Sequence, residues 1–102
     1  MNRLVLAAQV VERGALRYTP AGLPALDLVL DHRSQVSEDG QPRQVAMQLK
    51  AVAIGAITRP LGALTLGSPA QFAGFLAASR NGRGLVFHLT DVHTPDDPAA
   101  PV

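Results

Sequence analysis

The sequence contains no cysteine and no tryptophan, and only one tyrosine and three phenylalanines among its 102 residues. Without cysteine the chain forms no disulfide and offers no thiolate ligand to zinc. No apolar run approaches the roughly 18 residues that indicate a transmembrane helix. The first residues also lack the basic region, long apolar segment and small-residue cleavage site of a signal peptide. We therefore expect a cytoplasmic protein with no membrane contact.

The sequence also lacks the motifs of an enzyme active site. Residues 82–84, Gly-Arg-Gly, form neither a P-loop nor a dinucleotide fingerprint, because the flanking pattern is missing. His88 and His93 lie five residues apart in a predicted strand, so they face opposite sides and cannot hold one metal ion. Asp91 and His93 share a face, but such a pair is typical of a solvated strand edge. We predict no catalytic residue, no metal site, no cofactor and no enzymatic activity.

Length and charge indicate one domain with a mild preference for nucleic acid. The segment 95–102, PDDPAAPV, has the composition of a disordered tail, so the predicted domain covers residues 1–94. The formal net charge is +1, and leaving out Asp96 and Asp97 gives nine basic minus six acidic residues, or +3, over 1–94. Eight of the nine basic residues are arginine, which binds phosphate bidentately. Arginine enrichment is equally consistent with genomic base composition, so charge alone leaves both interpretations open.

Five segments have the residue pattern of β-strands. Apolar and polar residues alternate with the strand period in most of them, and glycine or proline separates them. The predicted strands are residues 3–11, 25–33, 43–53, 70–78 and 84 or 85–93. The first is apolar on both faces, so its outer face is expected to meet either the chain's own loops or a second subunit. In the third, the parity that contains Val45, Met47, Leu49 and Ala51 is expected to face inward.

The connections carry their own signals. Residues 12–16 and 20–24 are predicted turns, 34–42 an exposed loop with a turn at 38–40, and 79–84 a hairpin with Asn-Gly at its centre. Residues 53–64 are apolar without alternation, which predicts a short helix or helical turn that begins or ends near Pro60. Gly74 predicts a bulge or bend within its strand. His32 continues the inward parity of its strand, so we expect a hydrogen-bonded histidine at the end of a barrel.

The order of these segments resembles that of bacterial single-strand DNA-binding proteins with an OB fold. The likeness rests on residues 2–6 (NRLVL), 16–17 (LR), 19–22 (TPAG) and 28–30 (LVL). Within that superfamily, residues 22–24 (GLP), 30–34 (LDHRS), 44–49 (QVAMQL) and 74–76 (GFL) resemble the family of primosomal replication protein N, called PriB. The resemblance reaches about Val92. It implies an all-β, five-stranded Greek-key OB-fold barrel with a short helix or helical turn between the third and fourth strands.

The resemblance also implies a function. It suggests a homodimeric, non-enzymatic accessory protein of the replication-restart primosome, which binds single-stranded DNA and bridges it to a restart helicase of the PriA type and to other primosome proteins. Two alternatives stay open. One is a mainly protein-binding OB adaptor whose DNA contact is incidental. The other is an oligosaccharide- or RNA-binding OB module, because the fold alone does not select the ligand.

Single-strand binders combine a basic groove with aromatic side chains, and each stacked base is worth about 1–3 kcal/mol. Asp27 and Asp31 on the polar side of the second strand would repel phosphate, so contact is expected toward Arg33. The predicted nucleic-acid-binding residues are Arg17, Tyr18, Arg33, Arg43, Gln44, Gln48, Lys50, Arg80 and Arg83. Related proteins often carry an aromatic on the outer face of the third strand, where this chain has Ala46, and its phenylalanines are expected in the core. The sequence therefore predicts weak, salt-dependent binding.

Overall fold

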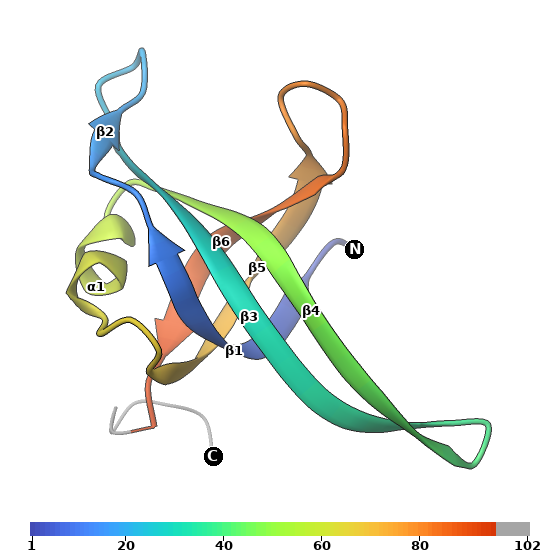
Figure 1. The fold of residues 1–102 in the computed structure, drawn as a ribbon. Helices are drawn as coiled ribbons and strands as arrows, with labels where there is room; N and C mark the ends of the chain where they lie inside the picture. Colours follow the sequence, from blue (N-terminus) through green and yellow to red (C-terminus); the bar gives the residue numbers. More distant parts are fainter. Residues whose placement is uncertain (96–102) are drawn as a thin grey trace.

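Five β-strands close into a barrel, beside which lie a two-residue strand and one short helix (Figure 1), in residues 1–95, the part of the chain that the computed structural model describes. The elements are β1 (Leu4–Arg13), β2 (Arg17–Tyr18), β3 (Pro24–Glu38), β4 (Gln41–Ile54), α1 (Thr58–Ala63), β5 (Pro69–Ala78) and β6 (Leu85–His93). The strand order is β1-β5-β6-β4-β3-β2, and an additional pairing of β1 with β3 closes the barrel. The predicted OB fold is confirmed, with β2 as a two-residue addition at its edge. No helix within residues 1–95 is long and apolar enough to cross a membrane.

The core lies inside the barrel and is filled by alternate residues of the strands. The fully buried side chains of greatest volume are Phe72, Phe87, Leu30, Leu61 and Val10. His32 is only 8% exposed and closes one end of this core. Its Nδ1 lies 2.6 Å from the carbonyl oxygen of Ala7 and its Nε2 lies 2.8 Å from the hydroxyl of Ser34. The expected hydrogen-bonded histidine at the barrel end is confirmed.

The predicted loop 34–42 is wrong, because β3 and β4 continue through it as a two-stranded arm that projects from the barrel (Figure 1). The strands stay paired as far as Glu38 and Gln41, and Asp39 and Gly40 form the turn with φ of 52° and 73°. Positive φ at both positions is the primed geometry that suits a two-residue hairpin, so the turn at 38–40 was predicted correctly. Outside the barrel neither face of the arm is covered. Met47 has the predicted inward parity, since it lies opposite the buried His32, but no core covers it there and its side chain is 40% exposed.

Helix α1 covers one end of the barrel and begins two residues before Pro60, as the proline predicted. Its Leu61 is fully buried against the core. Arg13 fastens the far end of the helix: its Nη1 donates to the carbonyl oxygens of Leu61 at 3.3 Å and Leu64 at 2.6 Å. Arg13 is the last residue of β1, which continues its pairing with β3 past a bulge after Val10. The turn predicted from residue 12 was therefore placed too early.

An irregularity occurs at Gly74, but the extra residue is Thr90 of the partner strand β6, which the pairing skips, rather than a residue of Gly74's own strand. The pairing of β5 with β6 shifts register between Ala73 and Gly74. A Cβ atom at Gly74 would collide with the backbone carbonyl group of His88, so the two strands approach closely only because this residue is glycine. The predicted disordered tail, 95–102, lies outside the described residues except for Pro95 and stays a prediction, as does the domain boundary at 94.

Candidate nucleic-acid interface

One continuous sheet surface runs across four strands on the outside of the barrel. Directly opposed residues on neighbouring strands point to the same side. Asp27 of β3 lies opposite Val52 of β4, and Val52 lies opposite His88 of β6. His88 in turn lies opposite Phe75 of β5, so all four side chains point to one side. We call this surface the outer face. By the same register it includes Asp27, Val29, Asp31, Arg33, Gln44, Ala46, Gln48, Lys50, Val52, Ile54, Phe75 and His88.

The structure brings most of the predicted site residues onto this face or beside it. Arg33, Gln44, Gln48 and Lys50 lie on the outer face itself. The strand β2, which carries Arg17 and Tyr18, and the β5–β6 loop, which carries Arg80 and Arg83, project from the same end of the barrel on its two sides (Figure 1).

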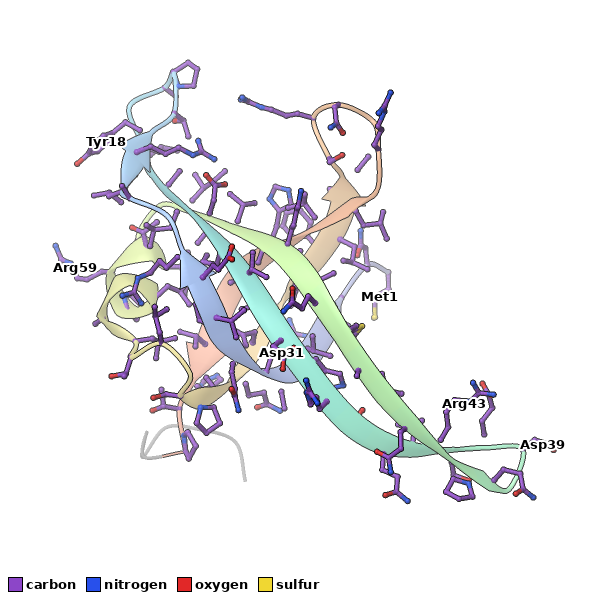
Figure 2. The ribbon with its side chains drawn as sticks, in the orientation of Figure 1. Met1, Tyr18, Asp31, Asp39, Arg43 and Arg59 are labelled. Atoms are coloured by element: carbon purple, nitrogen blue, oxygen red, sulfur yellow. The ribbon has the colours of Figure 1, made fainter. Side chains whose placement is uncertain are left out.

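Arg43 is separate from this group. It lies near the hairpin turn formed by Asp39, far along the arm from the barrel (Figure 2). Its register partner is Val36, so it points to the opposite side of β4 from Gln44 and Gln48.

Three of the predicted arginines are held by acidic residues, a feature that residue composition alone does not reveal. The ion pairs join Arg17 Nε to Asp27 at 2.8 Å, Arg33 Nε to Asp31 at 3.4 Å and Arg43 Nε to Glu38 at 2.7 Å. Lys50, Arg80 and Arg83 form no ion pair with any residue in the described range 1–95. Among the predicted site cations, these three are therefore the ones available to phosphate.

The carboxylate of Asp27 interacts with positive charges from both sides of this end of the barrel. The hydrogen bond from Arg17 holds the pKa of the Asp27 carboxyl below its usual value; burial partly offsets this, and the positive charges of Arg17 and Arg80 add to it. Because Arg80 belongs to the β5–β6 loop and Arg17 to β2, both neighbouring elements place positive charge near this carboxylate. The phosphate repulsion expected from Asp27 is correspondingly reduced.

The aromatic residues do not all lie in the core. Phe72 and Phe87 are fully buried as expected, but Phe75 is 39% exposed on the outer face, so its placement in the core was wrong. Its ring stacks on the imidazole of His88, with ring centroids 4.7 Å apart and planes 8° from parallel. Strand alternation contained the signal, because Phe75 is three residues from the inward-facing Phe72 and so has the opposite parity.

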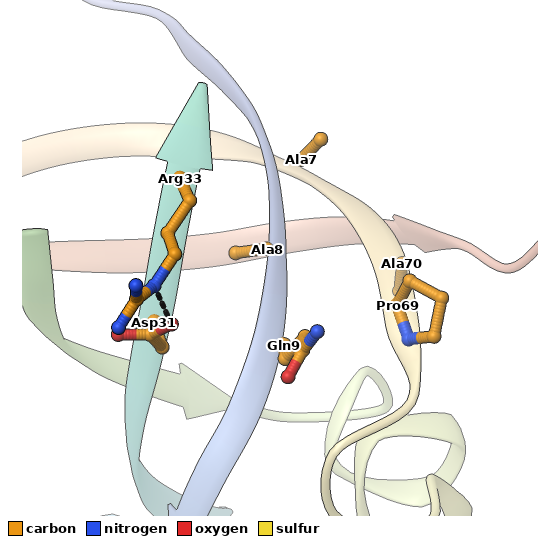
Figure 3. Close-up of a pocket in the computed structure, with 7 residues that line it drawn as sticks. All are labelled: Ala7, Ala8, Gln9, Asp31, Arg33, Pro69 and Ala70. Carbon is orange, nitrogen blue, oxygen red and sulfur yellow. Dashed lines mark hydrogen bonds and ion pairs between the residues drawn. The ribbon is translucent and has the colours of Figure 1, made fainter. Parts of the chain in front are cut away.

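A cavity of about 440 Å³ lies beside β1, next to the Asp31–Arg33 ion pair (Figure 3). It is lined by Ala7, Ala8, Gln9, Asp31, Arg33, Pro69 and Ala70. Arg33 bends toward Asp31 at this cavity, which ties its charge to that carboxylate (Figure 3). Residues 1–95 hold no cluster of three or more side chains suited to a metal ion.

The barrel topology places the chain in the class of OB-fold proteins. A family profile described as "another single-strand binding protein family" matches residues 2–91. The replication restart protein PriB of Bordetella pertussis is 51% identical over 80 residues, which span 78% of this chain and 75% of that protein.

Solved structures agree with this assignment. The structure of PriB from Ralstonia solanacearum superposes with a TM-score of 0.85 at 36% identity, over 93% of this chain and 98% of the other. The SSB domain of a Synechococcus protein superposes with a TM-score of 0.67 at 27% identity, over 91% and 94% of the two chains. The chain belongs to the PriB family of single-strand binding-type OB-fold proteins, as the sequence resemblance implied.

Proposed function

We propose that the protein binds single-stranded DNA along its outer face and acts, without catalysis, in replication restart. The observation that carries this proposal is the placement of Lys50 on the outer face, with Arg80 and Arg83 in the adjoining loop, none of them in an ion pair with a residue in 1–95. Membership in a family whose relatives are named replication restart proteins supports the biological setting. This proposal places the protein in the cytoplasm.

All residues predicted from the sequence to contact DNA remain in the proposal, but we expect their contributions to binding to differ. Lys50, Arg80 and Arg83 would neutralise phosphates directly, and Gln44 and Gln48 would donate hydrogen bonds from the polar part of the outer face. Arg17 and Arg33 would contribute less because each already serves a carboxylate. Tyr18, 66% exposed beside Arg17, would contact the strand at the edge, and Arg43 only if DNA reached the arm.

The test is to titrate the protein into three fluorescein-labelled ligands in separate experiments: a single-stranded oligonucleotide, the matched duplex and a PriA-type helicase. Binding is followed by fluorescence anisotropy at several salt concentrations. We expect single strands to bind in preference to duplex. With three available cations, log K should fall against log salt with a slope of about −2, from about −0.7 per neutralised phosphate. Helicase binding without measurable single-strand binding at any salt concentration would favour the protein-binding adaptor instead.

We further propose that the protein bridges DNA and helicase as a homodimer. Among the described strands, β1 pairs with β3 only from Gln9 onward, so residues 4–8 have β5 on one edge and no strand on the other. Near this edge Val5 is 48% exposed and Met47 is 40% exposed, and Met47 lies opposite His32, which itself contacts Ala7. Such an edge with apolar neighbours is suited to pairing with a second copy.

Sedimentation velocity at micromolar concentration should show a dimer. The variant Val5→Lys, which puts a charge on the proposed contact, should sediment as a folded monomer. A wild-type monomer at these concentrations would refute the dimer while leaving single-strand binding open.

A further inference from the structure

We propose that Phe75 and His88 form a platform on which an unpaired nucleobase stacks. This inference rests on the proposed single-strand binding and names the part of the outer face that holds the base. The sequence predicted no such platform, since Ala46 occupies the expected aromatic position. The structure supplies two exposed or half-exposed rings elsewhere on the same face, from β5 and β6.

The ring pair has the geometry that a base requires. Its planes are 8° from parallel with centroids 4.7 Å apart, so a flat aromatic base would extend an existing stack. The two strands approach closely beside the ring pair, because Gly74, the neighbour of Phe75, has no Cβ atom to collide with the backbone of His88. Stacking of this kind tolerates any base, because every base has a π-face.

A cavity beside the rings gives the base a place to enter. It measures about 220 Å³ and is lined by Val52, Ile54, Phe75, His88, Leu89 and Thr90. Val52 is the register partner of His88 and lies on the same face, and Ile54, another residue of the cavity lining, is 43% exposed. This lining is mostly apolar and so matches the face of a base better than a phosphate or a sugar.

Charge around the cavity favours nucleic acid over a second copy of the chain as its occupant. Lys50 precedes Val52 by two residues on the same face, about 7 Å along the strand. The strands that carry the two rings are joined by the loop with Arg80 and Arg83. A base on the platform would thus have phosphate-binding cations on its flanks, whereas a second copy would bring these like charges together. Duplex DNA would not reach the platform, because its bases are already stacked.

The experiment compares two labelled strands of about 16 nucleotides, the upper site size for one OB fold. One is oligothymidylate, and the other is an abasic sugar-phosphate strand of the same length. Phe75→Leu keeps an apolar side chain but removes the ring, so it should weaken oligothymidylate binding at least about fivefold. Binding of the abasic strand and the salt slope should not change, since no phosphate contact is lost. Leu66→Ala, at an exposed leucine in the α1–β5 loop, is the matched control and should leave both unchanged.

Phe75→Trp supplies a second readout that does not depend on how well the leucine variant folds. Because the chain has no tryptophan, the new indole is the sole reporter of its kind, and oligothymidylate should quench it while the abasic strand should not. Wild-type affinity in a folded Phe75→Leu variant, or equal response of the indole to both strands, would overturn the platform and leave single-strand binding intact. Failure of the wild-type protein to bind oligothymidylate would instead remove the proposed function, and the platform with it.

Discussion

Arg17 holds Asp27 through two parallel hydrogen bonds, from Nε to Oδ2 at 2.8 Å and from Nη2 to Oδ1 at 3.0 Å. The pair joins β2 to β3 at the end of the barrel where the basic loop also lies, and it occupies a position on the outer face. The charges of Arg17 and Asp27 largely neutralise each other, so neither is fully available to a ligand. If the proposed function holds, this contact within the protein should lower the strength of single-strand binding.

Replacement of Asp27 by asparagine should strengthen single-strand binding. It removes a negative charge from the outer face and releases Arg17, so the salt slope should steepen by about 0.7, one additional phosphate. The gain in affinity should be up to about fivefold, the size of one charge pair at 4 Å in water. Asp39→Asn, which makes the same change of charge at the distant hairpin turn, is the control for net charge. Equal effects of the two variants in anisotropy titrations would contradict the proposed role of the ion pair.

The same pair should give stability that depends on pH. The hydrogen bond from Arg17 lowers the pKa of Asp27 in the folded protein, so the folded state binds this proton less readily than the unfolded chain. The stabilisation is present above the unfolded pKa of about 3.9 and is lost as pH falls through the lower folded pKa. Thermal melts should show wild type above Asp27→Asn at pH 7, with the gap closing in strong acid. The gap should be small because both side chains are largely exposed; a gap that widens in acid would refute the assignment.

Lys50, Arg80 and Arg83, the predicted site cations that form no ion pair within residues 1–95, should dominate the salt dependence. Lys50→Ala, Arg80→Ala and Arg83→Ala should each weaken binding and flatten the slope by about 0.7, without a large change in melting temperature. Arg33→Ala should do less, because Asp31 already holds this guanidinium. Arg59→Ala, at an exposed position on α1 away from the outer face (Figure 2), should have little effect. If the four variants on the face and its loop leave binding unchanged, the interface lies elsewhere.

Arg13 should matter for stability rather than for DNA. Its guanidinium donates to two carbonyl oxygens at the end of α1, and hydrogen bonds to charged groups are worth about 1.5–3 kcal/mol. Arg13→Met keeps the side-chain length and should lower the free energy of unfolding by about that amount in urea titrations. Arg3→Met, at an exposed position before β1, should be close to neutral. A neutral Arg13→Met would mean that core packing alone holds the helix.

The parts of the fold that could be read from sequence are those where one face is buried. Alternation located the barrel strands, and Pro60 and Gly74 marked the helix start and the irregular strand pairing, because each residue type acts locally. The arm could not be read, since a hairpin outside the barrel buries neither face and has the polar composition of a loop. The pairing of Arg17 with Asp27 was also out of reach, because it depends on the register of β2 against β3. Phe75 could have been placed by parity, but its partner His88 required the pairing of β5 with β6.

Ala46 occupies the position at which the sequence resemblance implied an aromatic residue. It lies exposed on the outer face between Gln44 and Gln48 and opposite Arg33, so a large side chain there would meet solvent rather than the core. Strands also accept tryptophan well, and Ala46→Trp should fold normally. If DNA follows the outer face outward from Lys50, the new indole should stack on a base and strengthen binding by about 1 kcal/mol, roughly fivefold, with little change in salt slope.

Indole fluorescence then reports the path of the strand directly. Oligothymidylate should quench Ala46→Trp, whereas it should not quench Val36→Trp, whose residue is 45% exposed and belongs to the opposite side of the arm. Quenching of both would mean that the strand wraps the arm, and quenching of Val36→Trp alone would move the site to the other face. A folded Ala46→Trp protein with unchanged affinity and no response to DNA would confine single-strand contact to the barrel end near Lys50, Arg80 and Arg83. The arm would then be free to serve a protein partner, since its polar outer side would carry no DNA.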